Sequence, residues 1–283
     1  MPEVATIDFH VTCECNQACA YCWGPQEIEP VDTTTALAIV SKIAAGPARR
    51  IVFTGGDPLK RPDCGLLIRA AKGEGLEVAV STTGDELTDS FLATHGSFID
   101  LISLPLDGAS EGVSSRTKKK GHLGAVIKAL DLLAGYPDID VKVATPVTRH
   151  NLTDVSNIAS LLDELTGTIP NRLFYNVFQA YPRSMASGVD WEELVVTDAE
   201  FQALQDEVTA EEHPYPINWL SHETLDKLYV MVFPDGSLTI PSGSEFGSYG
   251  DFLAIRDIDE FLRTTDFDAP KHRRHAEGWQ RGP

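Results

Sequence analysis

The sequence predicts an α/β fold, namely a partial (β/α)6 barrel of the TIM type followed by a small α+β extension. Short apolar runs of strand length alternate with longer helical patterns through the first two thirds of the chain. This alternation is typical of parallel strands joined by right-handed helical crossovers. It yields six strands, fewer than the eight that close a complete barrel, and it stops near Tyr181.

Each predicted strand is short and apolar, and five of the six are followed by a helix with recognisable ends. Asp32 or Thr33 caps the first helix, Gly46-Pro47 ends it, and Gly73 stops the second. The predicted strands are Ile7–Val11, Ile51–Thr54, Leu76–Ser81, Ile99–Leu104, Val141–Pro146 and Leu173–Phe178. The predicted helices between them are Thr33–Ala45, Pro62–Lys72, Thr88–Thr94, Leu123–Leu133 and Leu152–Leu165.

The pattern changes after residue 181, so we expect a barrel domain over 1–181 and an extension over 182–283. Pro234-Asp235-Gly236 lies between two apolar runs and predicts a β-hairpin. The elements expected in the extension are a loop at Pro182–Asp190, a helix at Thr197–Thr209, hairpin strands at Leu228–Phe233 and Ser237–Ile240, a helix at Ile258–Arg263 and a polar tail.

Composition indicates a folded cytoplasmic protein. The 283 residues are 42% hydrophobic and 23% charged, without a signal peptide at Met1–Thr12 or an apolar run long enough to span a membrane. With 42 acidic and 23 basic residues the net charge is −19, which disfavours a nucleic-acid partner. One basic run, Arg116 with Lys118–Lys120, is either a solvated loop or a dock for an anionic electron donor or substrate.

The cysteines favour a metal site over disulfides. There are five, and Cys13, Cys15, Cys19 and Cys22 fall within ten positions after the first strand, whereas Cys64 lies apart. Three thiolates without an evident fourth are incomplete for structural zinc, but they suit a 4Fe–4S cluster with one open iron. The alternatives are three buried cysteines, or a zinc loop completed by His10 or Cys13. We expect Cys13 and Cys64 to serve packing.

Cys15, Cys19 and Cys22 form the pattern C-x-x-x-C-x-x-C, with Tyr21 before the last cysteine. This motif resembles the signature of the radical SAM superfamily. The resemblance implies one 4Fe–4S cluster held by these cysteines and S-adenosylmethionine bound to the open iron. It also implies reductive cleavage of that cofactor to a 5′-deoxyadenosyl radical. By the same resemblance Tyr21 lies against the adenine, although plain core packing is an alternative.

Further candidates stand at the strand ends, where parallel sheets place their chemistry. Gly55, Gly56, Asp57 and Pro58 follow the second strand and resemble the Gly-Gly-Glu-Pro-like motif of the family. That resemblance implies a hold on the methionyl amino group, with Asp replacing Glu. The third strand ends in Ser81-Thr82-Thr83, for which the resemblance implies contact with the methionyl carboxylate or the ribose. A helix cap or a turn is the alternative.

Later strands add looser matches. Asp107 ends the fourth strand, Arg116 in the next loop is a candidate carboxylate clamp, and Thr148 at the fifth is a candidate cofactor contact. Asn176 and Gln179 near the end of the sixth strand either face a substrate or satisfy backbone groups. No residue is assigned as catalytic.

The last third bears on the substrate. Its hairpin resembles the SPASM or twitch region of peptide-maturing and sugar-oxidising family members, yet no cysteine follows Cys64, so we expect a single cluster. We favour an enzyme acting on a small metabolite, such as a nucleoside, sugar or amino-acid derivative. Modification of a ribosomally made peptide and activation of a glycyl-radical enzyme are alternatives. A passive electron carrier needs neither an open iron nor a barrel.

Two further expectations concern partners and the tail. The resemblance implies a flavodoxin- or ferredoxin-type electron donor. The tail His272–Trp279 either folds over the barrel mouth to meet an anionic substrate or lies in solvent.

Overall fold

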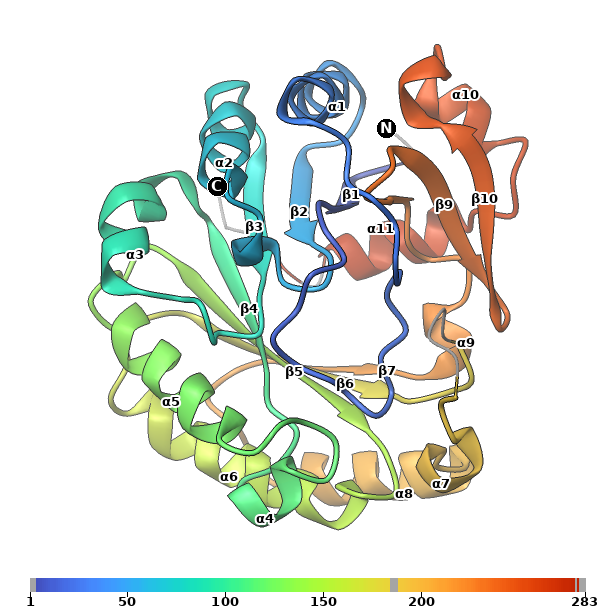
Figure 1. Cartoon of the computed structure of the whole chain (residues 1–283). Coiled ribbons are helices and arrows are strands. Elements are labelled where there is room, and N and C mark those ends of the chain that lie inside the picture. The colour runs from blue at the N-terminus through green and yellow to red at the C-terminus, as the bar shows by residue number, and fades with distance from the viewer. Residues whose placement is uncertain (1–3, 184–187, 278, 280–283) are drawn as a thin grey trace.

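A computed structural model describes residues 4–183, 188–277 and 279 of the chain. Their strands form one sheet in the order β10-β9-β8-β1-β2-β3-β4-β5-β6-β7, and β1 to β7 run parallel. The sheet curves into a partial barrel with helices around its outside (Figure 1). The strands are β1 Thr6–His10, β2 Arg50–Thr54, β3 Glu77–Ser81, β4 Leu101–Pro105, β5 Asp140–Val147, β6 Leu173–Gln179, β7 Ile217–Leu220, β8 Met231–Val232, β9 Ser237–Ser242 and β10 Glu245–Asp251.

The expected alternation of strands and helices is confirmed, with small shifts at the ends. The second helix, for example, begins at Cys64 instead of Pro62, because Arg61 and Asp63 form a turn before it. The helices are α1 Thr33–Ala45, α2 Cys64–Gly73, α3 Asp89–His95, α4 Glu111–Ser114, α5 His122–Leu133, α6 Val155–Thr166, α7 Trp191–Leu194, α8 Asp198–Thr209, α9 His222–Leu225, α10 Ile258–Leu262 and α11 Ala269–Glu277.

A seventh parallel strand, β7, pairs with β6 and was not predicted from the sequence. Its four residues include Asn218, whose amide donates to the Asn176 side chain at 2.9 Å. The strand is too short to produce a recognisable period-two pattern, and Pro214 and Pro216 precede it.

The predicted hairpin is confirmed as β8 and β9, with Met231 opposite Thr239. Its first strand is shorter than expected, and β10 adds an antiparallel strand that the sequence did not indicate. β8 also pairs in parallel with β1, so residues after 181 join the same sheet at both of its edges. Part of the predicted loop Pro182–Asp190, residues 184–187, lies outside the described residues.

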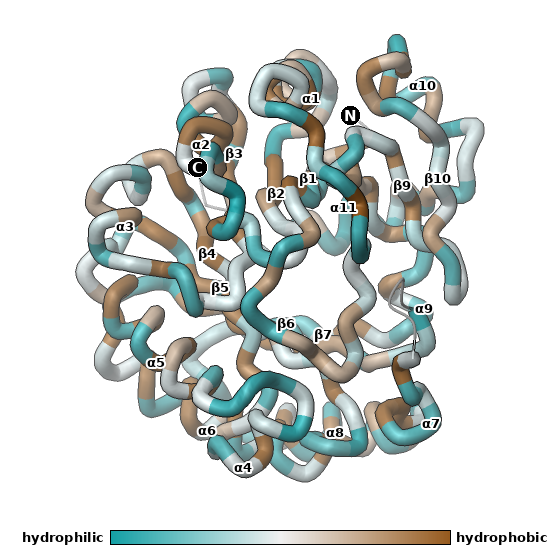
Figure 2. The backbone as a smooth tube through the Cα atoms, in the orientation of Figure 1, coloured by the Kyte–Doolittle hydropathy of each residue, from teal (hydrophilic) through white to brown (hydrophobic). Residues whose placement is uncertain are grey.

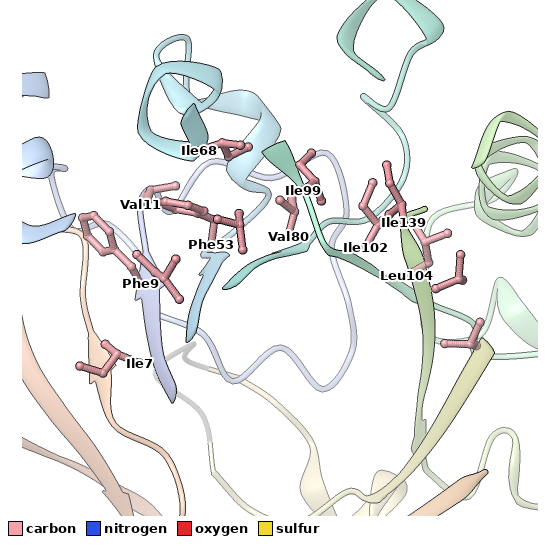
Figure 3. Packing of buried hydrophobic residues seen from close by; sticks show 14 of the residues in the cluster. Ile7, Phe9, Val11, Phe53, Ile68, Val80, Ile99, Ile102, Leu104 and Ile139 are labelled. Carbon is pink, nitrogen blue, oxygen red and sulfur yellow. The ribbon is translucent and has the colours of Figure 1, made fainter. Parts of the chain in front are cut away.

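The hydrophobic core lies between the sheet and the surrounding helices. On β1, Ile7 and Phe9 are fully buried on this side, and Val11 follows them, as Figure 3 shows together with Phe53 of β2 and Ile68 of α2. Figure 2 shows hydrophobic and hydrophilic residues alternating around the outer helices, the pattern of helices that bury one face. The alternate residues of β1, among them Asp8 and His10, therefore face the inside of the barrel.

The polar tail forms helix α11 and packs beneath the barrel, so it neither covers the mouth nor lies free in solvent. His272 is 3% exposed, and its Nε2 accepts from the backbone N–H groups of Ala5 and Thr6 at 3.0 and 3.2 Å. Its Nδ1 bonds the carbonyl of Leu228 at 2.8 Å. These partners include the start of β1, so the tail closes the amino-terminal end of the sheet.

Candidate cofactor and substrate site

The three signature cysteines lie together on the loop that follows β1. In Figure 1 this dark-blue segment runs across the ring of strands before it reaches α1. The N–H of Cys22 donates to the carbonyl of Cys19 at 3.1 Å, and the N–H of Gln17 points to the sulfur of Cys15 at 3.4 Å. Burial raises the pKa of Cys15 and Cys22, and the charge of nearby Cys19 raises both further.

Cys13 and Cys64 do not join this group. The surroundings of the Cys13 thiol are Ile28 and the carboxylates of Asp235 and Glu29. Cys64 is buried in α2, where burial raises the pKa of its thiol to about 12. Among the described residues, no three His, Cys, Asp or Glu side chains converge on one point as ligands of a single metal ion would. A cubane cluster takes each thiolate on a different iron, so its ligands need not converge in this way.

A buried cation stands beside the cysteine loop. The amino group of Lys118 lies 3.1 Å from the sulfur of Cys19 and 5.3 Å from the ring centre of Tyr21. Burial alone lowers the pKa of Lys118, but Asp107 and Cys19 together raise it above its ordinary value. A partly buried set of three thiols with a neighbouring cation fits a negatively charged, thiolate-held cluster.

The two glycines after β2 hold the cysteine loop against the sheet. The N–H groups of Gly56 and Asp57 donate to the carbonyls of Thr12 and Glu14 at 2.8 and 2.7 Å. Gly55 has φ +145°, and a Cβ there would lie 2.3 Å from the Thr12 oxygen; at Gly56 it would lie 2.2 Å from the Glu14 oxygen. Only glycine therefore permits this approach.

Asp57 connects this turn to the end of β3. Its fully buried carboxylate accepts from the Thr82 hydroxyl at 2.9 Å, from the Thr83 N–H at 3.1 Å and from the Leu59 N–H at 3.0 Å. Thr82 and Thr83 thus serve this network, whereas Ser81 lines the cavity inside the barrel. Pro58 opens a short 3₁₀ turn at Pro58–Lys60.

Tyr21 and Asp107 form a buried pair. The Tyr21 hydroxyl donates to a carboxylate oxygen of Asp107 at 2.7 Å, and the Thr117 hydroxyl donates to the same oxygen at 2.6 Å. Burial and the charge of Asp107 raise the pKa of Tyr21. Asp107 itself is not exposed, so it fixes Tyr21 at the cavity wall and does not reach the cavity.

The two remaining candidates lie apart from the cavity. Arg116 is exposed, and its guanidinium donates to the His150 carbonyl at 3.3 Å. Thr148 is buried in a turn in which its N–H donates to the Asn151 side chain at 2.7 Å. The basic residue of this run that lies beside the cysteines is Lys118, whereas Arg116 was the candidate carboxylate clamp predicted from the sequence. The basic run and its position between two strand ends were the available signal, but four candidates compete within it.

A cavity of about 1010 Å³ extends from the cysteine loop down through the barrel. Tyr21, Trp23 and Lys118 line its upper end, and Arg50 and Trp279 line its floor. Asn176 and Gln179 line its wall, and Gln179 also donates to the Val196 carbonyl at 3.3 Å and accepts from the His222 N–H at 3.1 Å, so it satisfies backbone groups as well. All four tryptophans of the chain border this space: Trp23, Trp191, Trp219 and Trp279.

The curved parallel sheet, with three cysteines at the end of its first strand, defines a barrel enzyme that carries its cofactor at the carboxyl ends of the strands. A sequence model of the Radical SAM superfamily matches residues 9–162, and the chain belongs to that superfamily. Its cofactors are a 4Fe–4S cluster and S-adenosylmethionine. No helix among the described residues has both the length and the apolar character needed to cross a bilayer.

Curated relatives differ in what they act on. An S-adenosylmethionine-dependent nucleotide dehydratase of Lacinutrix mariniflava is 27% identical over 95% of this chain and 57% of its own length. The mycofactocin maturase of Mycobacterium ulcerans is 27% identical over 72% of this chain and 54% of its own. The chain thus spans a little over half the length of these relatives.

Solved structures share the fold at low sequence identity. Streptococcus suis SuiB bound to S-adenosylmethionine has a TM-score of 0.69 at 10% identity, covering 95% of this chain and 67% of that one. Native anSMEcpe with bound AdoMet has a TM-score of 0.65 at 13% identity, covering 95% and 82%. Both comparisons confirm the partial barrel.

Proposed function

We propose that this chain cleaves S-adenosylmethionine reductively at a cluster held by Cys15, Cys19 and Cys22 and turns the resulting radical on a small organic metabolite. The observation that carries the proposal is the position of the three thiols, on one loop at the carboxyl end of β1, directly beside a deep cavity. When bound, the reduced cluster supplies the electron that breaks the sulfonium C–S bond, leaving methionine and a 5′-deoxyadenosyl radical.

The chain's own residues orient the cofactor and shield the chemistry. Gly55 and Gly56 let the strand ends meet the cysteine loop, and their backbone is the candidate binding surface for the methionyl group. Tyr21, fixed by Asp107, presents a rigid aromatic wall to the adenosyl part. Lys118 is the candidate partner of the methionyl carboxylate, in place of Arg116. Enclosure by the barrel keeps water from the radical.

Two observations favour a small metabolite. The cavity has the size of a small-molecule pocket and lies inside the barrel. The relative named a nucleotide dehydratase aligns over nearly the whole chain, which supports a nucleoside or nucleotide derivative. A peptide substrate is the second candidate, supported by the mycofactocin maturase and by the fold shared with SuiB bound to precursor peptide SuiA, with a TM-score of 0.71. We infer that a flavodoxin- or ferredoxin-type protein donates the electron.

Anaerobic reconstitution tests the proposal. We expect about four irons per chain, formation of 5′-deoxyadenosine from S-adenosylmethionine under reducing conditions, and loss of both in Cys19→Ala. Cys64→Ala is the matched control, because that thiol is buried in α2 away from the loop. A wild-type chain that binds zinc alone, or a Cys19→Ala variant that keeps its iron, would refute the assignment.

A further inference from the structure

The inside of the barrel carries two charged side chains that the cofactor site does not use. Asp8 on β1 and Lys142 on β5 both face the cavity, below the level of the cysteine loop. Each is surrounded by protein, and each keeps contact with the cavity space. Within the described part of the chain, neither side chain forms a hydrogen bond or ion pair.

The other enclosed cations of the cavity wall are already paired. Arg50 bonds Glu77 and two carbonyls of the tail, and Lys118 contacts Cys19. Arg183 bonds Asp226 and the Gly243 carbonyl. A charge enclosed by protein ordinarily has such partners, because leaving it without them is costly. Lys142 and Asp8 line the same cavity and sense each other's charge, but no hydrogen bond or ion pair joins them in the described part of the chain.

The charge of the cavity wall is opposite to that of the chain. Two acidic residues line it, Asp8 and Glu223. Six basic residues line it, namely Arg50, Lys118, Lys142, Arg183, Lys271 and Arg274. The chain as a whole has 42 acidic and 23 basic residues. A concave surface of one sign inside a protein of the other sign attracts ligands of the protein's own sign.

We propose that the substrate is an anionic small molecule whose phosphate or carboxylate binds Lys142, while a hydroxyl or amino group next to it donates to Asp8. This inference deepens the proposed function and depends on it. Lys142 then anchors the substrate at the lower end of the cavity, with the rest of the molecule extending toward Tyr21 and the cysteine loop. A neutral metabolite would leave the Lys142 charge without a partner, so the same pair selects against it.

Equilibrium binding to the reconstituted enzyme with S-adenosylmethionine present is the test, measured by calorimetry. The probes are the four ribonucleoside triphosphates, the four matching neutral nucleosides, and a set of di- and tricarboxylates, so that phosphate and carboxylate sources are distinguished. We expect one anionic probe to bind at least tenfold more tightly than every neutral nucleoside. Lys142→Gln should lower the affinity for that probe at least tenfold, and Lys142→Arg should recover most of this affinity.

Lys128→Gln, on the exposed side of α5, is the matched control and should bind like the wild type. Equal binding of neutral and anionic probes by the wild type, or unchanged binding in Lys142→Gln, would overturn the inference. If Lys142→Gln fails to fold, its low iron content after reconstitution would reveal this. The comparison of anionic with neutral probes on the wild type then still tests the inference. If the wild type does not cleave S-adenosylmethionine at all, the proposed function fails instead.

Discussion

The indole of Trp279 stacks on the guanidinium of Arg50, with 3.8 Å between the Arg50 Cζ and the ring centre. The same arginine donates to the Trp279 carbonyl at 2.7 Å, and the indole N–H donates to Asp140 at 2.8 Å. Burial lowers the pKa of Arg50 to about 10. One residue near the end of the chain thus joins the starts of β2 and β5.

This relationship predicts that Trp279→Ala destabilises the fold. Trp279 is 9% exposed, so the substitution removes a large buried ring, its hydrogen bond and a cation–π contact. We expect a loss of roughly 3 to 5 kcal/mol in the free energy of unfolding, measured by urea denaturation. Trp279→Phe should recover part of it. A loss below about 1 kcal/mol in Trp279→Ala would contradict the role of the tail as a closure of the sheet.

Gly55→Ala should separate β2 from the cysteine loop. The new Cβ would meet the Thr12 oxygen at 2.3 Å in a backbone conformation that favours glycine, so the loop must move. We expect less than half the wild-type iron after reconstitution and a fall in thermal stability. Gly124→Ala is the control, because its Cβ meets nothing within 4 Å and lies in helix α5. That change should keep the iron and stabilise the fold by about 0.5 to 1 kcal/mol.

Asp57→Glu should lower the stability of the fold, although the motif that this turn resembles carries Glu at the matching position. The Asp57 carboxylate is fully buried and satisfied by Thr82, Thr83 and Leu59 at its present reach. One more methylene must displace these partners, so we expect a destabilisation of about 2 kcal/mol by urea denaturation. Asp131→Glu on the exposed side of α5 should change stability by less than about 0.5 kcal/mol. A stabilising Asp57→Glu would show that this network is dispensable.

Buried histidines should make the fold sensitive to acid. Burial lowers the pKa of His10 to about 4 and that of His275 to about 3, and it also lowers the pKa of His272. An unfolded chain takes up these protons near pH 6.5, so native stability is full above that pH and falls as the pH drops toward 4. His10 alone accounts for about 3 kcal/mol.

Urea denaturation at pH 7.5 and 5.0 measures this effect. His10→Phe keeps an aromatic ring beside Phe233, whose ring centre lies 5.2 Å from that of His10, but removes the titrating group. The variant should therefore lose less stability than the wild type between the two pH values. An identical loss in both proteins would show that His10 does not contribute.

The sequence predicts the barrel well because its signals are local. Apolar runs such as Ile51–Thr54 and the glycine at 73 need no distant partner to be recognised. Strand β7 was missed because Asn218 finds its partner, Asn176, on another strand. The tail was misjudged for the same reason: His272 and Trp279 are polar or isolated in the sequence, and only the folded barrel provides their partners.

In the candidate site, too, the features with a local sequence signal were predicted and those that depend on distant partners were not. The spacing of Cys15, Cys19 and Cys22 indicates a shared loop, and the structure places them on one. Lys118 and Arg116 look alike in the sequence, and only the folded structure shows that Lys118 contacts Cys19 while Arg116 lies exposed against the His150 carbonyl. Asp8 on β1 and Lys142 on β5 line the same cavity although these strands are far apart in the chain, and no local sequence pattern predicts this.

The four tryptophans around the cavity give the protein an optical property of its own. Because every indole in the chain borders the same space, the tryptophan emission is sensitive to what occupies that space. Binding of a ligand in the cavity should change the wavelength and intensity of this emission without any attached dye. The molecule thus carries a native fluorescent sensor for its own occupancy.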